Sequence, residues 1–304
     1  MKILLLGKGG QVGWELQRSL APLGELIALD RHSRNHCGDL ANLQGLTQTL
    51  QALRPDIIVN AAAYTAVDKA ESEPEQARLI NATAPGCLAQ EAHKIGAWLV
   101  HYSTDYVFDG SGAQAWREID VPAPINVYGQ TKLEGEQLVA QHCPRHLIFR
   151  TSWVYAARGN NFAKTMLRLA HERERLTVID DQWGAPTGAD LLADVTAHAL
   201  RQAVQQMQQG RAHIGTDAGI YHLAASGETT WSAYATHVLN HAKSAQPPAK
   251  LRVQEVVSVP ASAFPTPARR PYNSRLNTRK LESTFGLALP DWRLGVDRML
   301  AEVL

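Results

Sequence analysis

The chain has 304 residues, of which 45% are hydrophobic and 19% charged, and its formal net charge is +1. A chain of this length and composition buries a core without disulfides or metal ions. The balanced charge argues against binding of nucleic acid or of a membrane surface, and the isolated cysteines argue against a disulfide framework or a CxxC metal site.

The first 150 residues alternate short apolar runs with longer amphipathic segments. Apolar runs without strict alternation are typical of strands buried on both faces of a parallel sheet. The predicted strands are Ile3–Leu6, Leu26–Leu29, Ile57–Val59, Trp98–His101 and Leu147–Phe149. The predicted helices between them are Gln11–Leu23, Leu43–Leu53, Glu75–Ile95 and Asn126–Gln141. This alternation of strands and helices predicts a doubly wound α/β domain.

After Thr151 the alternation becomes less regular. The elements predicted there are helices over Asn160–Glu174 and Thr187–Gln206, an extended segment near Arg252–Val257, and short helices near Thr278–Phe285 and Leu294–Val303. Residues 202–219 are interpreted as a Gln-rich surface insertion, and residues 244–250 as a connector. We therefore predict a first domain over 1–150, which also receives part of 187–225, and a smaller cap formed mainly by 151–304.

The N-terminal apolar run, Ile3–Leu6, is short. A signal peptide needs an apolar core of about 7–15 residues, and no apolar run approaches the roughly 20 residues of a membrane span. We therefore expect a cytoplasmic protein, in which Cys37, Cys87 and Cys143 are reduced.

A glycine-rich turn joins the first predicted strand to the first predicted helix. Gly7, Gly10 and Gly13 form a GxxGxxG pattern, with Val12 at the place where the strict GxGxxG pattern has its third glycine. Glycine lets the backbone turn sharply and approach a pyrophosphate, whose charge is met by N–H groups at the helix N-terminus. The combination of strand, glycines and helix predicts a dinucleotide site. The alternative is a purely structural turn.

Residues after the second and third predicted strands bear on the choice of dinucleotide. Asp30 ends the second predicted strand, where a carboxylate would bond the hydroxyls of the adenosine ribose. Arg31 and Arg34 follow and would instead neutralise a 2′-phosphate, so NADH and NADPH both stay open. Asp39 is expected near the adenine. The small residues Ala61–Ala63 would let the cofactor lie close, or would serve helix packing.

Tyr128 and Lys132 form a YxxxK pair on a predicted helix. A spacing of four places both side chains on one face, about one turn apart. Because a nearby ammonium favours a phenolate, Lys132 is expected to lower the pKa of Tyr128 and make it a proton donor near neutral pH. Thr104 follows the fourth predicted strand, at the sheet edge where open α/β folds bind ligands. It is expected to bond a substrate carbonyl beside Tyr128; the alternative is that the tyrosine and lysine are ordinary surface residues.

Several stretches of the sequence resemble the signature stretches of the dTDP-4-dehydrorhamnose reductases. They are Asn60–Glu71, Tyr102–Gly110, Asn126–Lys132, Arg150–Tyr155 and Arg270–Leu276. The resemblance covers essentially the whole chain, and its chief divergence is the Gln-rich segment near 202–219. It implies a Rossmann-type extended short-chain dehydrogenase/reductase with a smaller C-terminal substrate-binding cap. The implied reaction is the last step of dTDP-L-rhamnose synthesis, which serves lipopolysaccharide O-antigen synthesis.

In that reaction, hydride would pass from NADPH or NADH to C4 of dTDP-4-dehydro-L-rhamnose. Tyr128 would protonate the developing alkoxide and Thr104 would polarise the carbonyl, while Lys132 would support the tyrosine and the nicotinamide ribose. Asp105 and Trp153 match family positions that line the sugar site, although Trp153 equally suits a plain core role. The predicted cofactor contacts are Gly7, Gly10, Gln11, Val12, Gly13, Asp30, Arg31, Asp39, Leu40, Ala62, Ala63, Tyr64, Thr65, Tyr128 and Lys132.

The resembled family is also associated with Mg²⁺ and with homodimers. Glu15 and Asp190 resemble carboxylates at a metal-bridged dimer interface, whereas Arg293 stands where a third carboxylate would be expected. The resemblance thus implies a homodimer with a structural Mg²⁺ at Glu15 and Asp190. Arg270 and Arg275 would meet the nucleotide diphosphate or form structural ion pairs.

Two rival classes share parts of this pattern. A 4,6-dehydratase of the superfamily would carry an acid directly after Asp105, where this chain has Tyr106. A C4 epimerase is not excluded by the trio Thr104, Tyr128 and Lys132 alone. A non-catalytic regulatory partner, like the beta subunit of methionine adenosyltransferase, is disfavoured because that trio is intact.

Overall fold

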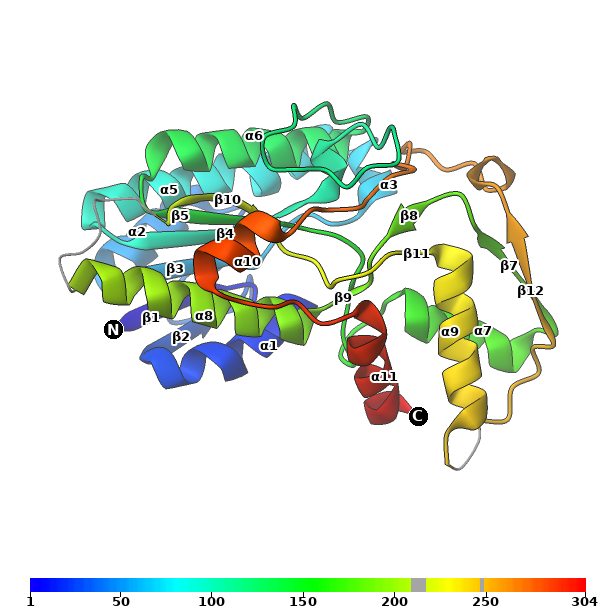
Figure 1. The fold of residues 1–304 in the computed structure, drawn as a ribbon. Helices are drawn as coiled ribbons and strands as arrows, with labels where there is room; N and C mark the ends of the chain where they lie inside the picture. Colours follow the sequence, from blue (N-terminus) through cyan, green and yellow to red (C-terminus); the bar gives the residue numbers. More distant parts are fainter. Residues whose placement is uncertain (209–216, 247–248) are drawn as a thin grey trace.

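The computed structural model describes residues 1–208, 217–246 and 249–304, and its centre is a sheet of six parallel strands in the order β10-β5-β4-β3-β1-β2 (Figure 1). The strands are β1 (Lys2–Leu6), β2 (Glu25–Leu29), β3 (Ile57–Asn60), β4 (Trp98–Thr104), β5 (His146–Thr151) and β10 (Gly219–His222). The strands predicted over the first 150 residues are all present, and the predicted doubly wound α/β fold is confirmed.

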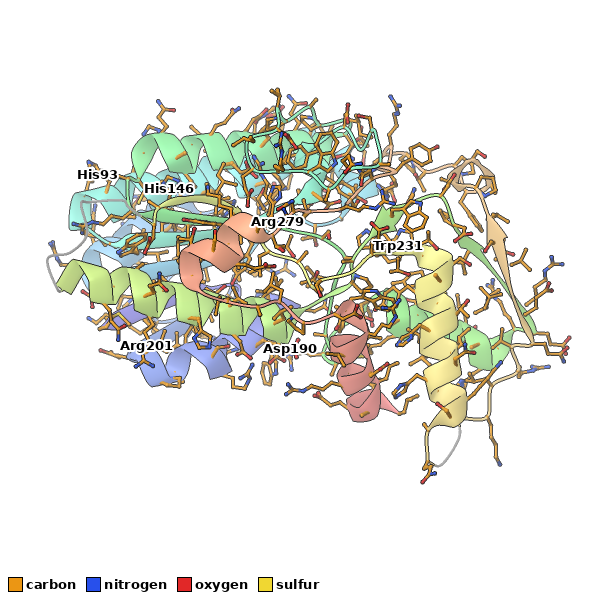
Figure 2. The ribbon with its side chains drawn as sticks, in the orientation of Figure 1. His93, His146, Asp190, Arg201, Trp231 and Arg279 are labelled. Atoms are coloured by element: carbon orange, nitrogen blue, oxygen red, sulfur yellow. The ribbon has the colours of Figure 1, made fainter. Side chains whose placement is uncertain are left out.

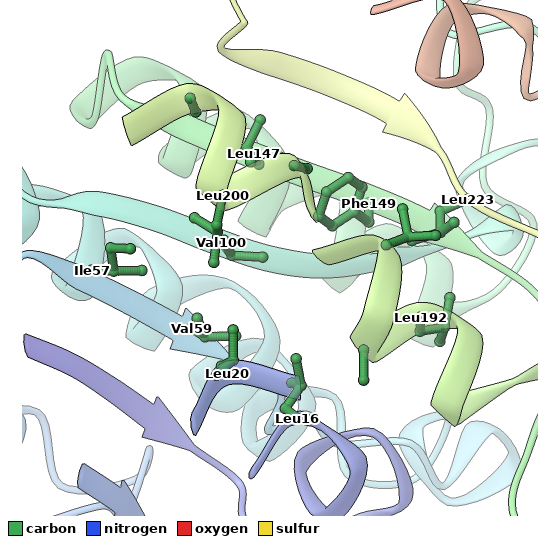
Figure 3. Packing of buried hydrophobic residues seen from close by; sticks show 14 of the residues in the cluster. Leu16, Leu20, Ile57, Val59, Val100, Leu147, Phe149, Leu192, Leu200 and Leu223 are labelled. Atoms are coloured by element: carbon green, nitrogen blue, oxygen red, sulfur yellow. The ribbon is translucent and has the colours of Figure 1, made fainter. Parts of the chain in front are cut away.

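Both faces of the sheet are apolar, because successive residues of a strand point to opposite sides. Ile3 and Leu5 of β1 belong to one buried cluster, part of which is shown in Figure 3, and Leu4 and Leu6 belong to another. The first face is covered by α1 (Gln11–Leu20), α8 (Ala189–Gln208) and α10 (Arg279–Phe285). The second is covered by α2 (Leu43–Leu53), α5 (Ala84–Ile95) and α6 (Val127–His142). Packing on both faces fixes the positions of the carboxyl ends of the strands, which lie along one edge of the sheet.

The connection between β3 and β4 is divided more finely than predicted. It contains α3 (Val67–Ala70), α4 (Pro74–Arg78), the π-helical stretch η2 (Leu79–Thr83) and α5. The single helix predicted over Glu75–Ile95 is therefore interrupted by a wider turn. Such π-helical stretches often occur at functional sites, and this one carries Asn81.

A second lobe is built from later parts of the chain (Figure 1). Its elements are β6 (Val154–Tyr155), α7 (Phe162–Glu172), β7 (Arg175–Ile179), β8 (Trp183–Gly184), β9 (Thr187–Gly188), β11 (Thr229–Thr230), α9 (Trp231–Ser244), β12 (Glu255–Val259) and α11 (Trp292–Val303). Short 3-10 turns are η1 (Ala21–Leu23), η3 (Asp105–Val107) and η4 (Ala261–Ala263). Tyr234 and Val238 of α9 pack with Trp292 and Val296 of α11 in the core of this lobe.

Several elements correct the sequence-based prediction. Helix α9 and strand β7 were not predicted, and Gly219 begins a strand of the main sheet instead of ending a surface insertion. The first part of that predicted insertion, 202–208, lies in α8. Its residues 209–216, and residues 247–248 of the predicted connector, lie outside the described residues. The division into a domain over 1–150 and a cap over 151–304 stays a prediction. Within the described ranges, no helix combines the length and hydropathy that crossing a membrane requires.

Candidate active site

The glycine-rich turn between β1 and α1 presses against the backbone that follows β3. Gly7 has φ +89°, and a Cβ there would lie 2.8 Å from the amide nitrogen of Ala62. The N–H of Gly10 donates to the Gly7 carbonyl over 3.0 Å, and Gly10 caps α1 with no side-chain hydrogen bond in the described part of the chain. Free N–H groups at a helix N-terminus, with no side chain in front of them, form a site for a pyrophosphate. The turn therefore fits a dinucleotide.

Gly13→Ala is expected to weaken NADPH binding by more than about tenfold, or about 1.4 kcal/mol. A Cβ on Gly13 would collide with the backbone carbonyl of Gly7, so the turn must change shape. Gly9→Ala is the matched control, since a Cβ there meets no atom of the described residues within 4 Å. Fluorescence titration with NADPH measures both, and equal dissociation constants for the two variants would contradict the prediction.

Residues after β2 form the expected adenosine side of the site. The Asp30 carboxylate accepts the His32 N–H over 2.9 Å and lies 3.9 Å from the Lys8 ammonium. Desolvation opposes their effect, but this hydrogen bond and this charge together lower the pKa of Asp30. Arg31 is exposed beside the loop, so a carboxylate and cations are available together.

The next two predicted cofactor residues differ in exposure. Asp39 accepts the Ala41 N–H over 3.0 Å, which holds the turn after β2. Leu40 is only 4% exposed and packs in the core beneath that turn. Only the backbone of Leu40 is therefore available to contact a bound cofactor.

Asn81 of η2 holds the segment 61–65 in place through its side-chain amide. The Asn81 side chain accepts the Tyr64 N–H over 2.8 Å and donates to the Tyr64 carbonyl over 3.1 Å. It also donates to the hydroxyl of Thr131 on α6 over 3.2 Å. Ala63 and Thr65 are exposed on the anchored segment, whereas the Tyr64 hydroxyl turns to Glu73. Asn81 thus fixes the predicted cofactor segment relative to the helix that carries Tyr128, and sequence reasoning missed it.

Thr104 and Tyr128 meet at the carboxyl end of β4 and the start of α6. Asn126 caps α6 by accepting the Gly129 N–H over 2.7 Å, which places Tyr128 in the first turn. Burial raises the pKa of Tyr128 to about 12, although a hydrogen bond with the Thr104 hydroxyl acts in the opposite direction. The structure places Thr104 and Tyr128 together, as the sequence predicts. With this raised pKa, the phenol carries its proton at neutral pH and can donate it.

Lys132 does not lower the pKa of Tyr128 as expected. In the structure its ammonium is turned to β4, where it donates to the Tyr102 carbonyl over 2.6 Å. Lys132 is 1% exposed, and burial lowers its own pKa to about 8. The expectation was wrong for this state because burial dominates the pKa of the phenol, and the Lys132 amine, which faces β4, is not among the groups that shift it.

Asp105 is a buried carboxylate beside these residues. It is 2% exposed, and its Oδ1 accepts the Thr104 hydroxyl over 3.0 Å. Its Oδ2 has no hydrogen-bond partner among the described residues. Burial raises the pKa of Asp105 to about 7, although hydrogen bonds with Ser274 and Thr104 oppose the shift. An unpaired oxygen in this position suits a hydroxyl donor from a ligand.

Asp105→Asn is expected to flatten the dependence of stability on pH between about pH 4 and the Asp105 pKa of about 7. In that window the unfolded Asp105 has lost its proton while the folded one keeps it. The folded state therefore binds more protons, and the free energy of unfolding falls as pH rises. Urea unfolding of both proteins across the window tests this, with Asp109→Asn as the control for an exposed carboxylate nearby. Parallel curves for wild type and Asp105→Asn would contradict it.

Trp153 has a backbone conformation that is rare for a residue other than glycine. Its φ is +48°, a conformation that costs a non-glycine residue roughly 1–3 kcal/mol. Its ring stacks on Trp231, with centroids 3.6 Å apart and planes 15° from parallel, and Figure 2 labels Trp231 at the start of α9. Gly184 lies under the ring, because a Cβ there would come within 2.7 Å of it. Packing therefore holds Trp153 in a strained conformation, which is common at ligand sites.

Glu15 and Asp190 do come together, but they do not fit a metal ion. Both line a cavity of about 220 Å³ (Asp190 is labelled in Figure 2). Glu15 is 3.5 Å from Arg18, and Asp190 is 3.9 Å from Arg298. Over the described ranges there is no group of three or more His, Cys, Asp or Glu residues that could hold a metal. The Mg²⁺ prediction is therefore not supported, because arginines already neutralise these carboxylates.

The remaining arginines singled out from the sequence form ion pairs within the chain. Arg293 pairs with Asp291 over 3.1 Å and Arg270 with Asp68 over 2.7 Å. Arg275 pairs with Glu228 over 2.6 Å. In this structure Arg270 and Arg275 therefore form structural ion pairs, the alternative to binding a nucleotide diphosphate.

Comparisons with known proteins agree over the whole chain. A family model described as "RmlD substrate binding domain" matches residues 1–304. A protein of Escherichia coli (strain K12) named dTDP-4-dehydrorhamnose reductase is 60% identical over 303 residues, which span 100% of this chain and 98% of that protein.

Two solved structures with the same name are similar in fold. One, from Clostridium acetobutylicum, has a TM-score of 0.86 at 33% identity and covers 100% of this chain and 99% of its own. The other, from Bacillus anthracis in complex with NADP, has a TM-score of 0.83 at 34% identity and covers 99% of both chains.

Proposed function

Because the chain belongs to the family of the dTDP-4-dehydrorhamnose reductases, which are oxidoreductases, we propose that it reduces the C4 keto group of dTDP-4-dehydro-L-rhamnose with NADPH or NADH. The product, dTDP-L-rhamnose, would complete dTDP-rhamnose synthesis. One observation carries the assignment of the site: at the carboxyl edge of the sheet, the Thr104 hydroxyl lies close enough to the Tyr128 phenol to act on its pKa. This edge is where open α/β folds bind their ligands.

Tyr128 and Thr104 act on the oxygen at C4. The cofactor supplies a hydride to C4, and the electron pair of the C=O bond moves to the oxygen. Tyr128 gives its phenolic proton to that oxygen, so that an alcohol forms. With substrate bound, the Thr104 hydroxyl would turn its proton from Asp105 to the same oxygen, where charge develops. Hydrogen bonds to that oxygen are usually the largest single contribution to catalysis at such a site. Lys132 holds the nicotinamide ribose and compensates the phenolate that remains on Tyr128.

The cofactor would lie across the turn at Gly7, Gly10 and Gly13 and along the segment 62–65. Its pyrophosphate would be bound by the free N–H groups at the start of α1, including those of Gln11 and Val12. The NADP in the B. anthracis structure supports a 2′-phosphorylated cofactor. In this chain Lys8 and Arg31 would bind that phosphate, while Asp30 would bond the ribose hydroxyls of NADH, so we propose that both cofactors are used.

The deoxysugar would lie between Asp105 and Trp153. The unpaired Oδ2 of Asp105 would accept a sugar hydroxyl, since a buried acceptor without a partner costs about 1–3 kcal/mol. The half-buried Trp153 indole, held by stacking on Trp231, would offer apolar surface to the sugar ring.

An assay with purified protein separates this proposal from its rivals. The absorbance of NADPH and of NADH is followed with saturating dTDP-4-dehydro-L-rhamnose, and the sugar is identified by NMR. Oxidation of the cofactor with formation of dTDP-L-rhamnose is the expected result. A second assay with dTDP-glucose tests the rivals, because that sugar has hydroxyls at C4 and C6. A C4 epimer without net oxidation of the cofactor would indicate an epimerase, and loss of water to give a 4-keto-6-deoxy sugar would indicate a dehydratase. Cofactor binding without turnover would indicate a regulatory subunit.

The homodimer implied by the resemblance stays a prediction. Sedimentation velocity of the purified chain tests it directly. A cytoplasmic location and a contribution to O-antigen synthesis also stay predictions from the sequence.

A further inference from the structure

Lys132 lies in a buried polar pocket that the proposed chemistry does not explain. Its amine is 2.6 Å from the Tyr102 carbonyl and 3.3 Å from Nε2 of His101, and both belong to β4. One turn along α6, Glu136 is bound by Arg150 through bonds of 2.9 and 2.6 Å. The lysine therefore takes its position from β4 and not from the carboxylate on its own helix.

His101 is itself held by Asn60 on β3. The ring is 1% exposed, and its Nδ1 lies 3.2 Å from the amide nitrogen of Asn60. The other end of that amide, Oδ1, accepts the Ala62 N–H over 3.2 Å, which fixes which way the amide faces. Asn60 must then donate to Nδ1, so the neutral ring carries its proton on Nε2. This N–H can donate a hydrogen bond only to the neutral amine of Lys132, whose pKa is lowered to about 8 by burial.

The groups around the lysine act on its charge in opposing directions. Burial and the positive charge of Lys132 lower the pKa of His101 well below its ordinary value, so the ring stays neutral. An N–H facing the amine disfavours the ammonium, as burial does, whereas Glu136 favours it. Arg150 forms an ion pair with Glu136, and the charge of Asp105 raises the pKa of Tyr128.

On the basis of the proposed function, we propose that His101 is a positioning residue for the reduction. Its ring, oriented by Asn60, forms with the Tyr102 carbonyl a clamp that places the Lys132 amine for the nicotinamide ribose and for Tyr128. The ring lies behind the lysine, and its effect on the reaction passes entirely through that amine. Sequence reasoning missed it because His101 reads as one residue of a buried strand.

Two substitutions of His101 distinguish an effect on the position of the Lys132 amine from an effect on folding. His101→Leu removes the contact and is expected to lower kcat by about 10- to 100-fold, the size of effect that a displacement of about 1 Å produces. In His101→Gln the side-chain amide reaches the place of Nε2, so kcat is expected within about threefold of wild type. Its oxygen can face the ammonium, and the alkaline limb of the pH profile should then move up by about 0.5 pH unit or more. His146→Gln is the control, because His146 lies at the amino end of β5 (Figure 2).

Each outcome decides the proposal. Loss in His101→Leu with recovery and a shifted alkaline limb in His101→Gln supports it. Wild-type kcat, KM and pH profile in His101→Leu overturn it, as does an unshifted limb in a folded His101→Gln when His101→Leu does not fold. Titration of NADPH binding against pH, which needs no turnover, gives the same comparison. If wild type binds NADPH but does not reduce the sugar, the proposed function fails, while the binding titration still decides the role of His101.

Discussion

Tyr128→Phe is expected to lower kcat by between about 100-fold and 10,000-fold, the range that a positioned proton donor contributes. The substitution removes the phenolic proton and leaves the ring in place at the start of α6. NADPH binding is expected to change little, because the glycine turn and the segment 62–65 are untouched. Stopped-flow or steady-state oxidation of NADPH measures the loss, and fluorescence titration measures the binding.

Tyr106→Phe is the matched control for this variant. The Tyr106 ring lies edge-on to that of Tyr128, with centroids 5.6 Å apart, so both variants remove a hydroxyl from the same aromatic pair. Tyr106→Phe is expected to stay within a few-fold of wild type. A Tyr128→Phe protein with near-normal kcat would show that the proton comes from elsewhere, and Asp105 would be examined next.

Glu136→Leu is expected to reduce the free energy of unfolding by about 3–5 kcal/mol, because it leaves the Arg150 charge buried and unpaired. Arg150 is 2% exposed, and its guanidinium also lies 5.0 Å from the centroid of the Phe108 ring. The pair joins α6 to β5 directly behind the proposed site. Urea unfolding, read as midpoint and slope, measures the change.

Two further proteins check the cause of that loss. Glu136→Leu combined with Arg150→Met is expected to recover most of the stability, since replacing a buried ion pair by apolar residues is often neutral. Glu172→Gln, which breaks an exposed pair with Arg168, is expected to cost less than about 1 kcal/mol. A small loss in the single Glu136 variant would mean that water reaches Arg150.

The sequence predicts the first half of the fold well, for a physical reason. Strands β1, β3, β4 and β5 are buried on both faces, so each appears as a short apolar run, and Leu43–Leu53 is predicted with its observed bounds. Helix α9 escaped because its buried side includes Ser232, Ala235 and Ala242, which carry little hydrophobic signal. Thr230, which accepts the Ala233 N–H and caps that helix, was the available sign.

The site divides in a similar way. Thr104, Tyr128 and the glycines were predictable because their spacing is set by one strand, one turn or one helix. Asn60, His101 and Asn81 were not, since each acts only through partners brought near by other strands or helices. The contacts that leave the metal prediction unsupported were hidden for the same reason. Arg298 is far along the chain from Glu15 and Asp190, yet it lines the same cavity.

The position of β10 has a consequence for how the chain is made. This strand pairs with β5 at the edge of the sheet, but it follows α8 and so leaves the ribosome much later than its partner. During that interval β5 presents an open row of backbone groups, which is a template for pairing with another chain. Translation that pauses between Thr151 and Gly219, or a fragment cut there, would prolong the exposure. Early chaperone engagement, more than the final stability, would then limit the yield of this protein.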